Sequence, residues 1–142
     1  DLDMLKRKVD NGATRAITQF FFDNDAYERY VERVRRAGIY VPIVPGIVPI
    51  HNFSAVRNFA SKCGASIPAW LADRFDGLDQ DPHTHSLVAA AVAAEQVFDL
   101  VDRGVDDLHF YTMNRPDLVF AICRLIGIRE TGEAARRELH AA

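Results

Sequence analysis

Three short apolar runs that alternate with helical patterns constrain the fold of this 142-residue chain more than any other feature. The runs lie at residues 16–22, 40–46 and 107–113. Because apolar residues at helical spacing follow each run, this order predicts parallel strands joined by crossover helices. A closed (β/α)8 TIM barrel usually needs about 250 residues, so we expect an α/β fold in which this chain supplies the last three or so β/α units, the C-terminal part of such a barrel. A self-standing doubly wound sheet is the main alternative, but three strands without a glycine-rich phosphate turn make a poor one.

Capping residues and glycines divide the segments between the runs into helices. Pro42 has no N–H to give to a central ladder, so irregular pairing is expected in the second run. We expect residues 1–128 to form the barrel part and residues 129–142 to be a charged tail that is a frayed helix or disordered. The expected helix starts are Asp23-Asn24-Asp25, Asn52 or Ser54, Asp81-Pro82, and Asn114 with Pro116 in the first turn; the expected ends are Asn11-Gly12, Gly38, Gly64, Gly104 and Gly127.

One amide, Gln19, interrupts the first apolar run where an ordinary buried strand would carry another Val or Ile. In regular alternation Ile17, Gln19 and Phe21 share one face, and Ala16, Thr18, Phe20 and Phe22 share the other. A buried amide without partners costs about 1–3 kcal/mol, so Gln19 either bonds within the protein or faces a polar ligand. In a barrel Gln19, the Pro45-Gly46 turn and residues 111–115 would meet at the mouth, where the strands end.

Composition sets aside several classes of function. The net charge of −3 gives no field that attracts nucleic acid or anionic lipid. No run of about 18 apolar residues and no signal-peptide pattern occurs, which indicates a cytoplasmic protein with no membrane role. Cys63 and Cys123 lie far apart in helical patterns, as two reduced thiols would. The chain opens on Asp1, so we expect it to be either processed or a piece of a longer protein.

Several residues that could carry other chemistry lack the partners it needs. His83 and His85 have no third ligand nearby, and the acidic residues at 76, 79 and 81 do not follow a calcium-loop pattern, so no metal site is expected. His51 and His109 are candidate general bases, but no nucleophile pattern accompanies them. A barrel lyase or aldolase would need a lysine at a strand end, and the sequence has none there.

Five segments, in this order and spacing, resemble methylenetetrahydrofolate reductase of the bacterial type over residues 1–128. They are AITQFFFD at 16–23, IVPGIVP at 43–49, IPAW at 67–70, FDGL at 75–78 and HFYTMNR at 109–115. The resemblance implies a (β/α)8 barrel that carries FAD and works in one-carbon metabolism and methionine biosynthesis. It implies an oxidoreductase in which NAD(P)H reduces the flavin, and the flavin passes a hydride to 5,10-methylenetetrahydrofolate to give 5-methyltetrahydrofolate. It also implies a homo-oligomer.

The resemblance further implies which residues bind the substrate. Gln19 matches the glutamine that hydrogen-bonds the folate pterin and can also meet the nicotinamide amide, and a carboxamide suits both because it donates and accepts without charge. Phe59 matches an aromatic residue that packs on bound ligand, although its apolar stripe also suits a core residue. Tyr111 lines the same cavity or serves as a structural aromatic. Arg115 matches an arginine near the benzoate-glutamate end of the folate, where a cation suits an anion.

The resemblance also implies that residues in the first turns of the chain contact the flavin. Asp1, Arg7 and Lys8 match the family segment that contacts the adenosine and pyrophosphate of FAD. Met4 and Ala55 stand where the family has polar contacts, so neither is carried over. The general acid is expected upstream of this chain, which leaves no catalytic residue within it, and the isolated chain is expected not to turn over. The alternative function is a non-catalytic half-barrel that binds folate or a partner.

Overall fold

A computed structural model describes residues 2–128 of the chain. The tail predicted at 129–142 lies outside the described residues, as does Asp1, and the predicted division at residue 128 stays a prediction. The elements in chain order are α1 (Leu2–Asp10), β1 (Ala16–Phe20), α2 (Asn24–Arg36), β2 (Ile43–Ile47), α3 (Phe53–Cys63), α4 (Ala69–Phe75), the 3₁₀ helix η1 (Leu78–Gln80), α5 (Pro82–Asp102), β3 (His109–Phe110) and α6 (Asp117–Leu125).

The three strands form one parallel sheet in the order β1-β2-β3, which confirms the predicted parallel α/β arrangement. All five residues of β2 are buried, as a strand covered on both faces requires. The irregular pairing predicted for the second run is present, but it lies opposite Pro45 rather than at Pro42, because β2 begins one residue after Pro42 and the ladder does not need the N–H that Pro42 lacks. β3 contributes only His109 and Phe110 to the ladder, so the predicted strand of seven residues was too long.

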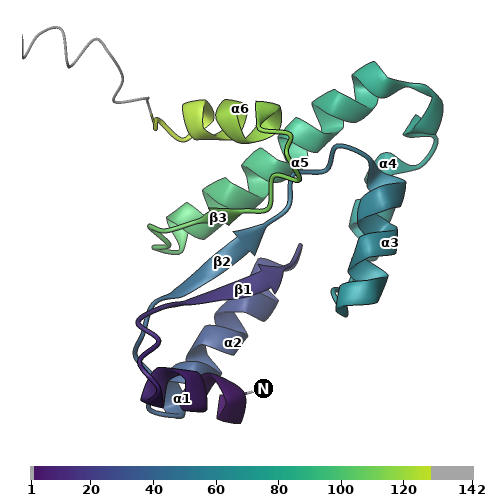
Figure 1. Ribbon diagram of the computed structural model, residues 1–142. Coiled ribbons are helices and arrows are strands. Elements are labelled where there is room, and N and C mark those ends of the chain that lie inside the picture. The colour runs from purple at the N-terminus through teal and green to yellow at the C-terminus, as the bar shows by residue number, and fades with distance from the viewer. Residues whose placement is uncertain (1, 129–142) are drawn as a thin grey trace, which may run out of the picture.

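Helices α2 and α5 lie along one side of the sheet, and α3 and α4 lie beyond the end toward which β1 and β2 run (Figure 1). Each long helix begins at a side chain that accepts from free backbone N–H groups. Asp23 caps α2, Asn52 rather than Ser54 caps α3, and Asp81 caps α5 ahead of Pro82. The cap predicted at Asn114 was wrong: α6 starts at Asp117, with Pro116 before it.

Met113 and Asn114 explain this later start of α6. Both residues have left-handed backbone angles, with φ of 51° and 60°. Asparagine tolerates this conformation better than most residues, so the segment makes a turn after β3 in place of a helix start.

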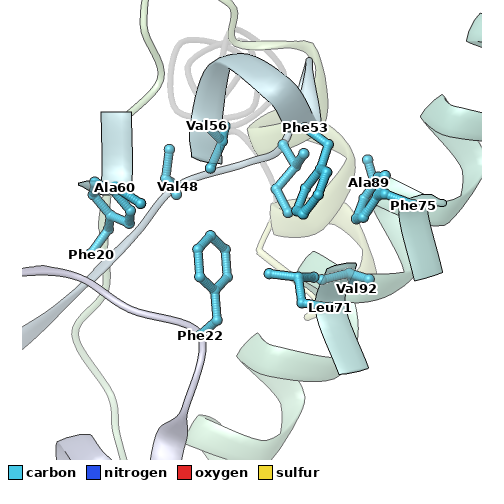
Figure 2. Packing of buried hydrophobic residues seen from close by; sticks show 11 residues of the cluster. Phe20, Phe22, Val48, Phe53, Val56, Ala60, Leu71, Phe75, Ala89 and Val92 are labelled. Carbon is cyan, nitrogen blue, oxygen red and sulfur yellow. The ribbon is translucent and has the colours of Figure 1, made fainter. Parts of the chain in front are cut away.

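The largest apolar cluster lies where β1 and β2 end, against α3, α4 and the first half of α5 (Figure 2). We call it the mouth cluster. Leu71 is fully buried there, and the rings of Phe53 and Phe75 stack 4.8 Å apart. Its buried members are Phe20, Phe22, Val48, Ile50, Phe53, Val56, Ala60, Leu71, Phe75, Ala89 and Val92.

Two smaller clusters hold the helices against the sheet. Ile47 packs with α5 and Ile122 of α6, and Ile43 packs with Leu5 of α1 and Val34 of α2. β1 and β3 each keep one edge without a partner strand among residues 2–128. Because a barrel closes only when every edge is paired, the described residues alone do not close one. In that same part of the chain, every helix is too short or too polar to cross a membrane.

Candidate functional site

A β-bulge lies at the centre of β1. Ile17 pairs with Val44 and Phe20 pairs with Gly46, so β1 advances three residues while β2 advances two. Thr18 and Gln19 together therefore oppose the single residue Pro45. Such an extra residue interrupts the ladder and redirects the neighbouring side chains.

The bulge overturns the predicted alternation along β1. Ala16 packs beside Ile43 against α1 and α2, whereas Phe20 packs in the mouth cluster, so these two residues do not share a face. Phe21 lies against Tyr27 of α2, with their rings stacked 5.3 Å apart. Ile17, predicted to share its face with Phe21, is 46% exposed. The prediction was wrong because strict alternation assumes a regular ladder.

Side chains satisfy the backbone groups that the bulge removes from the ladder. The Thr18 hydroxyl accepts from the Gly46 N–H at 2.9 Å. The Gln19 oxygen Oε1 accepts from the N–H of Phe20 at 3.0 Å. From the other side, the Tyr111 hydroxyl donates to the Thr18 carbonyl at 2.9 Å. Each group would otherwise lose a hydrogen bond in a half-buried place.

Gly46 is the residue that allows Tyr111 to reach across β2. A Cβ atom at this position would lie 2.6 Å from the Thr18 carbonyl oxygen and 2.6 Å from Cε2 of Tyr111. Because real Cβ atoms almost never come within 3.0 Å of another atom, no other residue fits without a shift. The sequence analysis expected Gly46 at the mouth but in a turn with Pro45, whereas β2 runs through both residues. It did not name Thr18, and a glycine inside a strand often marks such a close approach.

Gln19 itself is exposed rather than buried, so the premise that burial constrains its amide was wrong. Its oxygen bonds to the neighbouring backbone, and its amide nitrogen has no partner among residues 2–128. Gln19 lines a groove of about 460 Å³ along the free edge of β1, together with Ile17, Tyr30 and Gly64. In a closed barrel the next strand would occupy part of this groove, so the groove is not by itself a ligand site.

Two of the four predicted substrate residues pack on the ring of Phe20, the residue that follows Gln19 in β1. Phe59 of α3 stacks on Phe20 at 5.5 Å with an interplanar angle of 18°, and Tyr111 meets Phe20 edge-on at 6.4 Å. Phe59 and Tyr111 are half-buried against the mouth cluster. Gln19 precedes Phe20 in the chain and lines the groove at the free edge of β1 together with it, whereas neither Phe59 nor Tyr111 lines that groove.

Arg115 lies in a different cavity from Gln19. That cavity has a volume of about 360 Å³ and contains His51, Asp79 and Asp117 as well. The carbonyl of Arg115 lies 3.1 Å from Nε2 of His51, and its guanidinium is exposed. The structure thus places Arg115 on the turn after β3 but does not join it to Gln19 in one cavity.

The predicted flavin residues Arg7 and Lys8 lie apart from the mouth cluster. Both are exposed in the last turn of α1, at the end of the sheet where the strands begin (Figure 1). Neither cation has an ion pair among the described residues, whereas the neighbouring Lys6 pairs with Asp10 at 3.3 Å. Two free cations on one turn are able to hold an anion such as a pyrophosphate.

The other candidate residues have structural partners. The N–H of Phe53 donates to Nε2 of His85 at 3.2 Å, and the His85 ring lies 4.8 Å from Phe75. Asp81 accepts from Thr84 at the start of α5, and the Thr84 hydroxyl holds the pKa of that carboxyl below its usual range. Within residues 2–128 no three His, Cys, Asp or Glu side chains come together as a metal site would require. Cys63 and Cys123 are both free.

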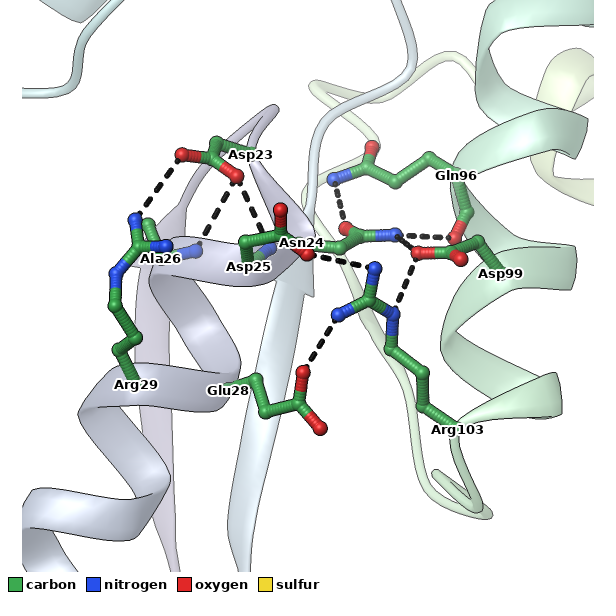
Figure 3. Close-up of polar contacts among 9 residues, drawn as sticks. All are labelled: Asp23, Asn24, Asp25, Ala26, Glu28, Arg29, Gln96, Asp99 and Arg103. Carbon is green, nitrogen blue, oxygen red and sulfur yellow. Dashed lines mark hydrogen bonds and ion pairs between the residues drawn. The ribbon is translucent and has the colours of Figure 1, made fainter.

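A polar network that the sequence analysis missed ties the loop after β1 to α5 (Figure 3). Asn24 donates to Asp99 at 2.7 Å, and this hydrogen bond holds the pKa of the Asp99 carboxyl below its usual range. Gln96 donates to the carbonyl of Phe21 at 2.7 Å.

Arg103 completes the network between α2 and α5. It pairs with Asp25 at 2.7 Å, Glu28 at 2.7 Å and Asp99 at 2.8 Å. The hydrogen bonds to Asp25 and then Asp99 raise the pKa of Arg103. Through Gln96, the network holds the backbone at Phe21, two residues after Gln19. Because Gln96 and Phe21 are 75 positions apart, no local pattern could reveal it.

The parallel strands, the crossover helices and the residues gathered at the strand ends define a segment of an α/β enzyme barrel with its ligand face at the mouth. The sequence model of the family described as methylenetetrahydrofolate reductase matches residues 1–127, and the chain belongs to this family of enzymes. This confirms the predicted resemblance and, with it, the TIM-barrel class.

Curated relatives agree with the family match. The chain is 52% identical over 129 residues to 5,10-methylenetetrahydrofolate reductase of Escherichia coli K12, which covers 91% of this chain and 44% of the relative. It is 41% identical over 128 residues to the enzyme of the same name from Buchnera aphidicola of Acyrthosiphon pisum, covering 90% of this chain and 44% of that protein. It is 32% identical over 136 residues to "Methylenetetrahydrofolate reductase (NADH) 1" of Arabidopsis thaliana, covering 96% of this chain and 23% of that protein.

The chain thus spans less than half the length of these relatives. The prediction that it supplies the last three units, the C-terminal part of the barrel, is not supported by the comparisons and is not retained. The physical reason is that successive β/α units of a barrel share one parallel pattern, so strand order does not tell where in the ring three of them lie.

Proposed function

We propose that the protein carrying this chain reduces 5,10-methylenetetrahydrofolate to 5-methyltetrahydrofolate, with FAD as bound cofactor and NAD(P)H as electron donor. One observation supports the proposal beyond family membership: the Gln19 amide lines one groove with Phe20, and Phe59 and Tyr111 pack on the ring of Phe20. A flat heterocycle with donors and acceptors on its edge suits an amide next to aromatic rings.

The residues of this chain suit the parts of the two ligands. Gln19 would bond the edge of the pterin, Phe59 would pack on the bound ligand, and Arg115 would pair with a carboxylate of the glutamate. Arg7 and Lys8 would serve as counter-charges for the pyrophosphate of FAD, with Asp1 contacting the adenosine. The flavin would supply the hydride transfer, and no residue of this chain is proposed as the general acid.

The remaining properties are proposed from the same resemblance. The name of the Arabidopsis relative mentions NADH and supports a nicotinamide donor. A homo-oligomer, a cytoplasmic location and a place in methionine biosynthesis stay predictions.

The test is an assay of the intact protein. We expect it to bind flavin, with absorbance near 450 nm, and to form 5-methyltetrahydrofolate from the methylene substrate with NADH or NADPH. Gln19→Ala should lower the rate at subsaturating folate, and Gln80→Ala, at an exposed glutamine of η1, should not. Absence of both flavin and product would refute the proposal. Folate binding without flavin would favour the alternative of a non-catalytic folate-binding half-barrel.

A further inference from the structure

The bulge fixes the polarity of the Gln19 amide. The N–H of Phe20 is a donor, so the atom of Gln19 that lies 3.0 Å from it is the carbonyl oxygen. The amide nitrogen is bonded to the same carbon and keeps two N–H donors that no residue in the described part of the chain accepts. Gln19 therefore turns its two N–H donors away from the backbone and toward a ligand, while its oxygen faces the N–H of Phe20.

The relative directions of the Gln19 and Phe20 side chains depend on the extra residue in β1. In a regular ladder Ile17 and Gln19 would point the same way, and Phe20 would point toward the helices. With the bulge, Phe20 takes the position opposite Gly46 and enters the mouth cluster. The bulge thus places an aromatic ring and an oriented amide side by side on the strand, which regular pairing cannot do.

Three residues outside the amide hold the bulge from both sides. The Thr18 hydroxyl accepts a hydrogen bond from the Gly46 N–H. Gly46, which has no side chain, leaves room for the Tyr111 ring, and the Tyr111 hydroxyl donates to the Thr18 carbonyl and so links it to the end of β3. The Tyr111 hydroxyl donates its proton to this backbone contact. The Tyr111 hydroxyl is therefore occupied within the protein, and it acts on the site through the position of Thr18 and Gln19.

We propose that the bulge is a positioning device in which Thr18, Gly46 and Tyr111 hold Gln19 so that its amide N–H groups donate to an acceptor atom, a carbonyl oxygen or an unprotonated ring nitrogen, on the heterocycle of the ligand. The choice of a folate as ligand rests on the proposed function. The claim that the bulge positions Gln19 depends only on the contacts among β1, β2 and the residue after β3.

The test compares Thr18→Val, Thr18→Ser and Thr14→Val in the intact protein. Valine keeps the shape of threonine and suits a strand but cannot accept from Gly46, whereas serine keeps the hydroxyl. Thr14 is exposed and precedes the strand, so its valine variant is the matched control. Tyr111→Phe, which removes only the hydroxyl that reaches Thr18, is the second variant if Thr18→Val does not fold.

The kinetic readout is the separation of KM from kcat. In Thr18→Val we expect the KM for methylenetetrahydrofolate to rise about five- to tenfold, the equivalent of one misplaced neutral hydrogen bond, with kcat within about twofold of native. Thr18→Ser should restore the KM, and Thr14→Val should leave both constants unchanged. A KM within about twofold of native in both Thr18→Val and Tyr111→Phe would overturn the proposal, as would a loss confined to kcat.

The second readout needs no ligand. Amide hydrogen exchange at Phe20 and Gly46 should be about tenfold faster in Thr18→Val than in native protein or Thr18→Ser, because the Gly46 N–H loses its acceptor and the bulge loosens. Unchanged exchange at both amides would overturn the device. If the native protein shows no reductase activity, the proposed function fails while this exchange result still decides the inference.

Discussion

Replacing Gly46 with alanine tests the close packing on which the site geometry depends. The added Cβ would lie 2.6 Å from the Thr18 oxygen and 2.6 Å from Cε2 of Tyr111, each about 0.8 Å short of the ordinary contact of 3.4 Å. The Tyr111 ring is able to swing away, but the Thr18 oxygen belongs to the backbone of β1 and moves only with the strand. The substitution should therefore break the hydrogen bond between Tyr111 and Thr18 as well as crowd the core.

The expected cost combines two effects. Overpacking of a close-packed interior costs about 1–3 kcal/mol, and a lost hydrogen bond costs about 1 kcal/mol. We therefore expect Gly46→Ala to lower the free energy of unfolding by about 3 kcal/mol. The φ of Gly46 is not in the left-handed region, so none of this cost is backbone strain.

Urea unfolding of the intact protein measures this cost, with Gly104→Ala as the matched control. Gly104 has φ of 89° and open space around its would-be Cβ, so alanine there costs only the left-handed backbone, about 1 kcal/mol. In a Tyr111→Ala background the cost of Gly46→Ala should fall without vanishing, because the contact with the Thr18 oxygen remains. A Gly46→Ala variant no less stable than Gly104→Ala would refute the close approach of β1 and β3 across β2.

Three further predictions concern the core, the polar network and the ligand. Leu71→Ala should cost about 2–5 kcal/mol in urea unfolding because Leu71 is fully buried in the mouth cluster, whereas Leu87→Ala, at 59% exposure, should cost little. Asn24→Ala removes the donor that lowers the pKa of Asp99, and the stability that this lowering provides is present above about pH 4 and is lost as pH falls through the native pKa. The difference in unfolding free energy between variant and native should therefore be larger at pH 7 than at pH 3, with the part due to the lost hydrogen bonds to Gln96 present at both. Arg115→Met should weaken binding of 5-methyltetrahydrofolate about tenfold, and should weaken binding of its pteroate analogue, which lacks the glutamate, much less. Equal losses of affinity for the two ligands in calorimetric titration would show that Arg115 does not bind the glutamate.

Sequence reasoning predicted the parts of the fold that follow from local rules. The apolar run at 16–22 contains β1, the glycines mark the helix ends, and Asp23 caps α2 as its pattern indicates. The parallel arrangement followed from the alternation of strands and helices. β3 was predicted too long because apolar composition alone does not show which residues find a ladder partner, and only two of them do.

The geometry of the candidate site could not be predicted from the residue pattern of a single strand. Regular alternation has no place for an extra residue, so the faces of β1 were assigned wrongly on each side of Thr18 and Gln19. The signal was present in the sequence: two polar side chains that are able to bond backbone groups stand together inside an apolar run. The contact of Tyr111 with Thr18 joins residues 93 positions apart, and no local pattern could have predicted it.

A structure of the intact protein with 5-methyltetrahydrofolate bound tests the central claim most directly. We predict that the amide nitrogen of Gln19 lies within hydrogen-bond distance of an acceptor atom on the pterin, while its oxygen stays on the N–H of Phe20 and the bulge is unchanged. A pterin bound elsewhere, or one that presents a donor to a reversed Gln19 amide, would contradict the account.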